Sequence, residues 1–184
     1  MPGPQIAPQI APLPLVTLVL GGARSGKSAY AEALIGGDRA APYVATAEAG
    51  DAEMSRRIRH HRQRRPANWT TVEEPLELSA ALDRHARRDR PLLVDCLTLW
   101  LANLMGADRD IEAETATLTA RLKALAGPVV LVANEVGLGL VPATPLGRDF
   151  RDAAGRLNQA VAAAADRVVF VAAGLPLVLK DPPR

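Results

Sequence analysis

The sequence has little cysteine, few aromatic residues and no long apolar run, and each scarcity excludes a class of protein. Cys96 is the only cysteine in 184 residues, so the chain has no internal disulfide and no zinc site built from several cysteines. A lone cysteine also fits a reducing compartment. No apolar run has the length of a transmembrane helix. We therefore expect a cytoplasmic protein without a membrane span.

Charge and aromatic content argue against nucleic acid as a partner. The formal net charge is +2 and aromatic residues make up 3% of the chain, whereas nucleic-acid-binding domains usually carry a clear basic patch and a recognisable motif. Hydrophobic residues at 48% and charged residues at 23% are ordinary for a globular protein. The length predicts one folded domain, which we place over residues 15–184.

Residues 1–14 are expected to form a disordered or polyproline-like tail. Prolines occupy positions 2, 4, 8, 12 and 14 of this segment. The segment lacks the basic region followed by an apolar region that marks a secretory signal. Its composition leaves open a role as a ligand for a proline-binding module.

A glycine-rich motif carries the clearest functional signal. Residues 21–28 read GGARSGKS, which is G-x-x-x-x-G-K-S directly after an apolar run at residues 15–20. Backbone N–H groups of such a loop surround nucleotide phosphates, and the helix that follows adds positive partial charge. A chance match is disfavoured because a strand precedes the motif and a helix follows it. The predicted nucleotide-binding residues of the loop are Gly21, Gly22, Ala23, Arg24, Ser25, Gly26, Lys27 and Ser28.

Individual positions of the loop have predictable roles. Lys27 is expected to reach the β- and γ-phosphates, and the Ser28 hydroxyl is placed to ligate Mg²⁺. Gly21 and Gly26 permit a positive φ or a close backbone approach that a Cβ would obstruct. The helix that follows is expected to end at Gly36.

Apolar runs and helical patterns alternate along the chain. Continuous apolar strands separated by helices predict an α/β fold with a mostly parallel sheet covered on both faces. Right-handed crossovers bring strand C-termini to one edge, where ligands bind. The expected strands are 15–20, 42–46, 69–72, 91–95, 128–133, 167–172 and 177–180, and the expected later helices are 52–64, 76–88, 97–105, 111–125 and 150–165.

Three polar residues lie at or just after the ends of expected strands and are candidates for the site. Asp95 could hold Mg²⁺ through water or orient a nucleophile, or it could cap the helix that begins at residue 97. Glu135 could be a general base or a substrate contact, or a solvated loop acid. The Thr46 hydroxyl could meet phosphate or metal, or Thr46 could be a simple turn residue. All three positions are read from the sequence.

Residues 56–65 read RRIRHHRQRR, and this segment has three interpretations. It could be a solvated helix face, a nucleic-acid contact, or part of a phosphate-binding site with a reactive histidine. Helical geometry separates the two histidines, because His61 shares a stripe with Met54 and Ile58 while His60 lies about 100° to 120° away. A structural His61 and an exposed, reactive His60 are consistent with each other.

Several strings together resemble one enzyme family. They are GGARSGKS, YVAT, EM-x-x-RI-x-HH, RP-A-x-W, NEVG-x-G-x-VP, FRD-x-AGR-x-NQ and a terminal LK. The combination resembles the bifunctional adenosylcobinamide kinase/adenosylcobinamide-phosphate guanylyltransferase family of cobalamin biosynthesis. The resemblance runs from about residue 15 to residue 180 and implies a P-loop NTPase fold with a RecA-like sheet. It also implies homo-oligomers, since members of the family can assemble into homotrimers.

The resemblance implies two reactions and a set of site residues. Adenosylcobinamide is first phosphorylated with ATP or GTP, and GMP is then transferred from GTP through a histidine, which maps to His60. Family members often carry glutamate where this chain has Asp95. The resemblance assigns a nucleotide contact to Glu73, but Glu74 lies beside it, so this contact could belong to either residue. Beyond the loop, the implied nucleotide contacts are Thr46, Ala47, Glu48, His61, Arg62, Gln63, Arg64, Glu73 and Asp95, with Ser28 and Asp95 holding Mg²⁺ and Lys27 and His60 catalytic.

Two other functions fit the motif. One is a P-loop small-molecule kinase without guanylyl transfer, and the other is a nucleotide-binding switch without catalysis. The switch is disfavoured because the sequence lacks the guanine-recognising N-K-x-D string of switch GTPases.

Overall fold

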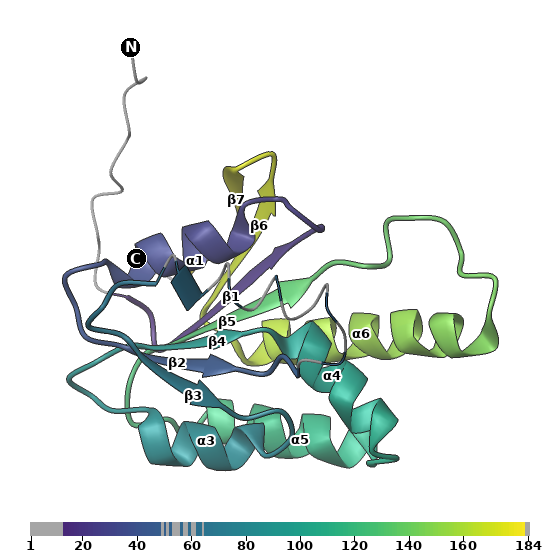
Figure 1. The fold of residues 1–184 in the computed structure, drawn as a ribbon, viewed down its shortest axis with the longest axis horizontal. Coiled ribbons are helices and arrows are strands. Elements are labelled where there is room, and N and C mark those ends of the chain that lie inside the picture. Colours follow the sequence, from purple (N-terminus) through teal and green to yellow (C-terminus); the bar gives the residue numbers. More distant parts are fainter. Residues whose placement is uncertain are drawn as a thin grey trace.

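The structure is a computed structural model that describes residues 13–48, 50, 52, 56, 59, 62, 63 and 65–182. Seven strands form one sheet in the order β3-β2-β4-β5-β1-β6-β7 (Figure 1). All adjacent strands pair in parallel except β6 and β7, which are antiparallel. The strands are β1 (Val16–Gly21), β2 (Pro42–Ala45), β3 (Thr70–Glu73), β4 (Leu92–Asp95), β5 (Val129–Asn134), β6 (Arg167–Ala172) and β7 (Leu175–Lys180).

Helices cover both faces of the sheet. Helix α1 lies on one face and α3, α4, α5 and α6 lie on the other (Figure 1). Within residues 52–63, the described positions Ala52, Arg56, Arg59, Arg62 and Gln63 have helical backbone, in agreement with the helix predicted there. The bounds of the helices are α1 (Lys27–Ile35), α3 (Leu78–His85), α4 (Leu97–Gly106), α5 (Ile111–Leu122) and α6 (Pro145–Ala164).

The central strands are buried on both faces, so they read as continuous apolar runs. Leu18 packs in the cluster shared with α3 to α6, and Val19 packs in the cluster shared with α1. Leu13, which falls inside the predicted tail, packs against this second cluster. Trp100 and Tyr43 are among the largest fully buried side chains. No helix within the described residues is both long and apolar enough to cross a membrane.

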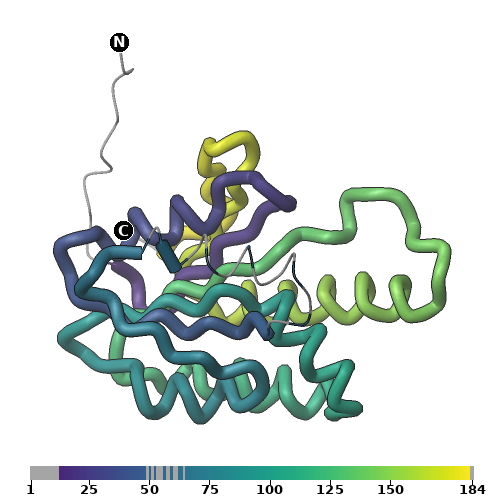
Figure 2. Tube along the Cα trace, viewed as in Figure 1, coloured from purple at the N-terminus to yellow at the C-terminus, as the bar shows by residue number. Residues whose placement is uncertain are grey.

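Strand boundaries agree closely with the sequence-based expectation, and the helices differ more. Helix α6 begins at Pro145, not at residue 150, because Thr144 Oγ1 accepts a hydrogen bond from the Gly147 N–H at 3.2 Å and proline occupies the first turn. Helix α3 ends at His85, short of residue 88, where Arg87 and Arg90 form an isolated bridge across a turn. Together α6 and the loop before it project beyond the sheet (Figure 2).

Strand β7 also departs from expectation. It begins at Leu175, two residues before the predicted start, and returns antiparallel to β6 through a tight turn with Ala173 and Gly174 at positive φ. A turn this short can join only antiparallel strands. The rule that gathers strand ends at one edge therefore holds for β1 to β6 only.

Candidate active site

The glycine-rich loop joins the end of β1 to the start of α1. Gly26 has φ 93°, as predicted, and Arg24 has φ 56°. Gly21 serves by close approach, because a Cβ there would lie 2.5 Å from the Val171 carbonyl oxygen. The Gly174 N–H donates to the Ser25 carbonyl at 2.8 Å, so the β6–β7 turn braces the loop from outside.

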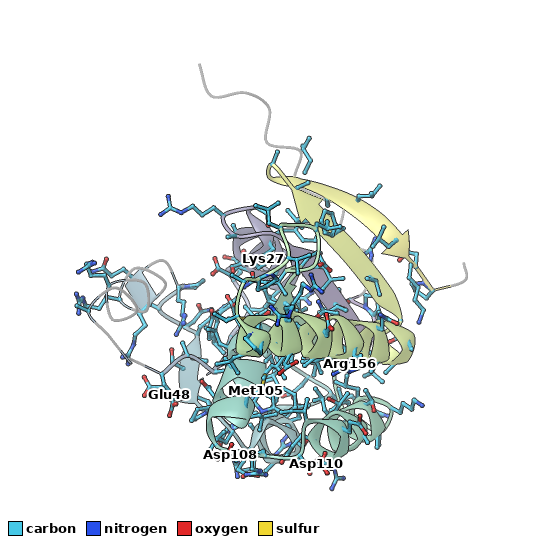
Figure 3. The ribbon with its side chains drawn as sticks, turned by 90° about the vertical axis from the view of Figure 1, so that its right-hand side faces the viewer. Lys27, Glu48, Met105, Asp108, Asp110 and Arg156 are labelled. Carbon is cyan, nitrogen blue, oxygen red and sulfur yellow. The ribbon has the colours of Figure 1, made fainter. Side chains whose placement is uncertain are left out.

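Lys27 folds back over the loop. Its Nζ donates to the Gly22 carbonyl at 3.0 Å, and the residue is 9% exposed. Burial lowers the pKa of the Lys27 ammonium, while the nearby Cys96 and Asp95 act in the opposite direction. Lys27 therefore lies near enough to Asp95 for their charges to interact. Asp95 ends β4, and β5 lies between β4 and β1, the strand that leads into the loop. Glu48, another predicted nucleotide contact, lies well apart from Lys27 at the edge of the molecule (Figure 3).

Asp95 is held by a tyrosine that the sequence analysis did not single out. The Tyr43 hydroxyl donates to Asp95 Oδ2 at 2.8 Å. Burial is the main cause that raises the pKa of Tyr43, and the Asp95 charge adds to it, so the phenol stays protonated and able to donate. The alternative in which Asp95 caps the next helix is wrong, because the N-cap of α4 is Cys96 and no side chain caps it.

Tyr43 also contacts the end of the arginine-rich segment. The Arg65 guanidinium carbon lies 3.4 Å from the Tyr43 ring centroid, a cation–π arrangement. Arg65 Nη1 donates to Thr71 Oγ1 of β3 at 2.7 Å. Tyr43 thus connects Asp95 with the residue at which the arginine-rich segment ends. Tyr43 can reach both Asp95 and Arg65 because β2 lies between β3 and β4, and no local motif encodes this strand order.

The Thr46 side chain has a structural role. Its Oγ1 donates to the Cys96 carbonyl at 2.7 Å and accepts from the Cys96 N–H at 2.9 Å, and the residue is fully buried. Asn103 Nδ2 donates to the Thr46 carbonyl at 2.7 Å. These bonds favour neither the phosphate nor the metal alternative for the hydroxyl. Burial raises the pKa of the neighbouring Cys96 thiol to about 12, so Cys96 is neutral and unreactive.

Two acids at the end of β3, Glu73 and Glu74, have different contacts. Glu74 stabilises the turn before α3. Its Oε1 accepts from the Glu77 N–H at 2.9 Å, and its Oε2 pairs with Arg84 at 3.1 Å. Glu73 is exposed and lies 3.4 Å from Arg62 Nη1. Two predicted nucleotide contacts, Arg62 and Glu73, are therefore brought together, and Glu74 is occupied elsewhere.

Glu135 lies where β5 meets the glycine-rich loop. Its N–H donates to the Gly21 carbonyl at 3.1 Å, so the loop and Glu135 share a backbone bond. Its Oε1 accepts from the Gly137 N–H. Asn158 of α6 supports this strand end by donating from Nδ2 to the Asn134 carbonyl at 3.1 Å.

Three predicted residues, His60, His61 and Arg64, lie outside the described residues, as do residues 1–12 of the predicted tail. Among the described residues, no group of three or more histidine, cysteine, aspartate and glutamate side chains could hold a metal ion. Within that part of the chain, the neighbours of Asp95 and Ser28 therefore do not form a protein-only metal cage.

Comparison with known proteins adds the identity of the family. The pattern of the cobinamide kinase / cobinamide phosphate guanyltransferase family matches residues 17–179. The chain belongs to this family. A Pseudomonas aeruginosa relative named bifunctional adenosylcobalamin biosynthesis protein CobP is 53% identical over 90% of this chain and 98% of its own length. An Escherichia coli relative, bifunctional adenosylcobalamin biosynthesis protein CobU, is 42% identical over 90% of this chain and 100% of its own.

As a member of this family, the chain is an enzyme, a cobinamide kinase and cobinamide phosphate guanylyltransferase. Among solved structures, the flagellar accessory protein FlaH from Methanocaldococcus jannaschii has a similar fold, with a TM-score of 0.50 and 10% identity over 92% of this chain and 80% of that one. At this identity the likeness concerns the fold alone. The predicted P-loop NTPase fold with a mostly parallel sheet is confirmed.

Proposed function

We propose that this enzyme phosphorylates adenosylcobinamide with ATP or GTP and then transfers GMP from GTP to the new phosphate, which gives adenosylcobinamide-GDP and pyrophosphate. The observation that carries the proposal is the family match over residues 17–179. The glycine-rich loop supports it independently, because it joins β1 to α1 with Gly26 at positive φ, and the backbone N–H groups of such a loop and helix start bind phosphates.

The nucleotide would bind along the edge of the sheet between the loop and Asp95. Lys27 supplies a cation near the β- and γ-phosphates. Mg²⁺ would be held by Ser28 and, directly or through water, by Asp95, and it would neutralise charge on the phosphates. The donor set fits, since hydroxyl and carboxylate oxygens suit Mg²⁺ and Tyr43 occupies only Oδ2 of the carboxylate. The further nucleotide contacts would come from residues after β2, from the end of β3 and from the arginine-rich segment, namely Ala47, Glu48, His61, Arg62, Gln63, Arg64 and Glu73. Thr46 is fully buried, and its N–H and carbonyl are bonded to Asp95 and Asn103, so it would position Ala47 and not contact the nucleotide itself.

His60 would be the nucleophile of the second reaction. A neutral imidazole nitrogen attacks the α-phosphorus of GTP, a P–N bond forms, and the bond to pyrophosphate breaks. A phosphate oxygen of adenosylcobinamide phosphate then attacks the same phosphorus and releases the imidazole. Exposed arginines of the segment, Arg56, Arg59 and Arg62, are available to stabilise the charge on pyrophosphate.

The covalent step is tested with GTP labelled in its α-phosphate. We expect wild-type protein and His85→Ala, a control at the third histidine, to retain label under alkaline conditions and to lose it in acid, as a phosphoramidate does. His60→Ala should show no label and no guanylyl transfer while it keeps much of the kinase rate. Label that persists on His60→Ala and disappears on His61→Ala would assign the nucleophile to the second histidine.

The same experiment separates the alternative function. A P-loop kinase without guanylyl transfer would phosphorylate cobinamide and form no adduct with GTP alone. We further propose a homo-oligomer, in keeping with the exposed apolar side chains on β7 and on the loop before α6. The nucleotide substrates and the buried, unpaired thiol of Cys96 support a cytoplasmic location.

A further inference from the structure

A groove of about 580 Å³ runs between α6 and the β6–β7 edge of the sheet. Leu20 of β1, Val168 of β6 and Leu179 of β7 contribute its apolar lining. Glu135, Asn158, Gln159 and Lys180 contribute its polar lining, and the Lys180 ammonium donates to the Ala162 carbonyl of α6 at 3.1 Å. Leu20 and Val168 belong to the core cluster on the α6 face, so the groove opens on the face of the sheet opposite α1.

One end of the groove lies beside the start of the glycine-rich loop. Leu20 immediately precedes Gly21, where the loop begins, and the Glu135 N–H donates to the Gly21 carbonyl at 3.1 Å. The Glu135 carboxylate, which accepts from the Gly137 N–H, is part of the lining at this end. A molecule in the groove can therefore present one group to the loop and extend its remaining atoms along α6.

The lining selects for a particular chemistry. Its apolar side chains come from three strands, from α6 and from the loop after β5, and they suit a hydrocarbon surface. Asn158 and Gln159 from α6 can exchange hydrogen bonds with amides. The Glu135 carboxylate is an acceptor that suits a hydroxyl group. An apolar molecule that carries amides and ends in a hydroxyl matches this arrangement better than a second nucleotide. Glu135 would repel phosphates at the loop end, and the Lys180 ammonium already donates to the Ala162 and Ala163 carbonyls.

We propose that this groove holds the acceptor substrate, with the aminopropanol arm of the cobinamide directed at Glu135. The inference rests on the proposed function and adds the location of the acceptor. In the kinase step the hydroxyl oxygen attacks the γ-phosphorus, the bond from that phosphorus to the β–γ bridging oxygen breaks, and the hydroxyl proton passes to the Glu135 carboxylate.

The groove is tested by filling it from α6. A Cβ at Gly155, which lines the groove, meets no atom within 4 Å, and the same holds for Gly106 at the end of α4 outside the groove. We expect Gly155→Leu to raise the KM for adenosylcobinamide at least tenfold and to leave the GMP adduct formed with GTP alone unchanged. Gly106→Leu is the matched control and should behave as the wild type in both assays.

Two further variants keep the test decisive. Gln159→Trp fills the groove from an exposed position, so it replaces Gly155→Leu if that protein does not fold. Glu135→Gln should lower the kinase kcat by roughly 10²-fold or more, as for loss of a general base, while guanylyl transfer to preformed adenosylcobinamide phosphate continues.

Each outcome distinguishes the groove from the overall function. An unchanged KM for adenosylcobinamide in the folded groove-filling variants would place the acceptor elsewhere, even if both reactions proceed. Loss of the GMP adduct from the wild type would instead remove the guanylyl-transfer function. A KM increase accompanied by a changed molecular mass in light scattering would assign the groove to subunit contact and overturn the substrate assignment.

Discussion

At the scale of single residues, Tyr43 contacts both Asp95 and the end of the arginine-rich segment. Its hydroxyl donates to Asp95 Oδ2 while its ring lies under the Arg65 guanidinium. The hydrogen bond fixes one carboxylate oxygen and leaves the other oriented for a ligand. Tyr43 is therefore a positioning residue for Asp95, and its removal should alter how the enzyme uses Mg²⁺.

We expect Tyr43→Phe to raise the Mg²⁺ concentration for half-maximal kinase rate by about 3- to 10-fold, because the carboxylate loses a hydrogen bond worth roughly 0.5–1.5 kcal/mol. A Mg²⁺ titration of the kinase rate measures the effect, and excess Mg²⁺ should restore the rate. Tyr30→Phe is the control, since Tyr30 is the other tyrosine and does not contact Asp95. An unchanged Mg²⁺ dependence in Tyr43→Phe would mean that the contact only packs the interior.

Residue-scale prediction from the sequence worked where the chemistry is local. The glycine-rich loop is contiguous, so the positive φ of Gly26 follows from eight adjacent letters. The bonds between Thr46 and Cys96 join residues 50 positions apart, and Tyr43 reaches Asp95 across 52. Such contacts depend on strand order, which a single sequence does not specify.

At the scale of elements, the two helices that flank the site use glycine in opposite ways. Gly26 begins α1 at φ 93°, and a Cβ there would lie 3.1 Å from Gly174 Cα. Gly155 lies within α6, where a Cβ would meet nothing within 4 Å. The same substitution should therefore change stability in opposite directions.

We expect Gly26→Ala to destabilise the protein by roughly 1–2 kcal/mol, the cost of a left-handed alanine, and Gly155→Ala to stabilise it by about 0.5–1 kcal/mol through helix propensity. At about 2–4 °C per kcal/mol for a chain of this size, calorimetry of the ligand-free variants resolves both shifts. A melting temperature that falls in both variants would show that Gly155 is required by a contact of the native protein.

The elements themselves were predictable to different degrees. Strand β6 has the predicted bounds, because an unbroken apolar run with a charged residue before it clearly marks where a strand begins and ends. The start of α6 was missed because Pro145 and Gly147 in its first turn weaken the helical pattern, although Thr144-Pro145 is a recognisable start signal. Helix ends respond to caps and turns, which are weaker signals than apolar periodicity.

At the scale of the whole molecule, the sheet order decides what the site contains. The sequence predicted an α/β fold and ligand binding at one edge, but not that β5 lies between β1 and β4. This order puts Glu135 between the loop and Asp95, and it gives the acceptor groove its position beside α6. The antiparallel return of β7 leaves one sheet edge with exposed leucines.

Those leucines and the projecting loop predict self-association. Leu140 is 97% exposed on the loop before α6, and Leu177 is 60% exposed on β7. Large apolar side chains exposed in groups mark interaction surfaces, and symmetric homo-oligomers are the common way to cover them. Leu138 and Leu179 both line the groove, so the two sets of exposed residues adjoin there.

We expect the double variant Leu140→Glu, Leu177→Glu to have a lower molecular mass than the wild type in light scattering, because each buried carboxylate opposes association. Its melting temperature should fall only as far as loss of the subunit contacts requires. Ala120→Glu, at an exposed position of α5, is the control and should keep the wild-type mass. A monomeric wild type would contradict self-association itself, and an oligomeric double variant would place the interface on another surface.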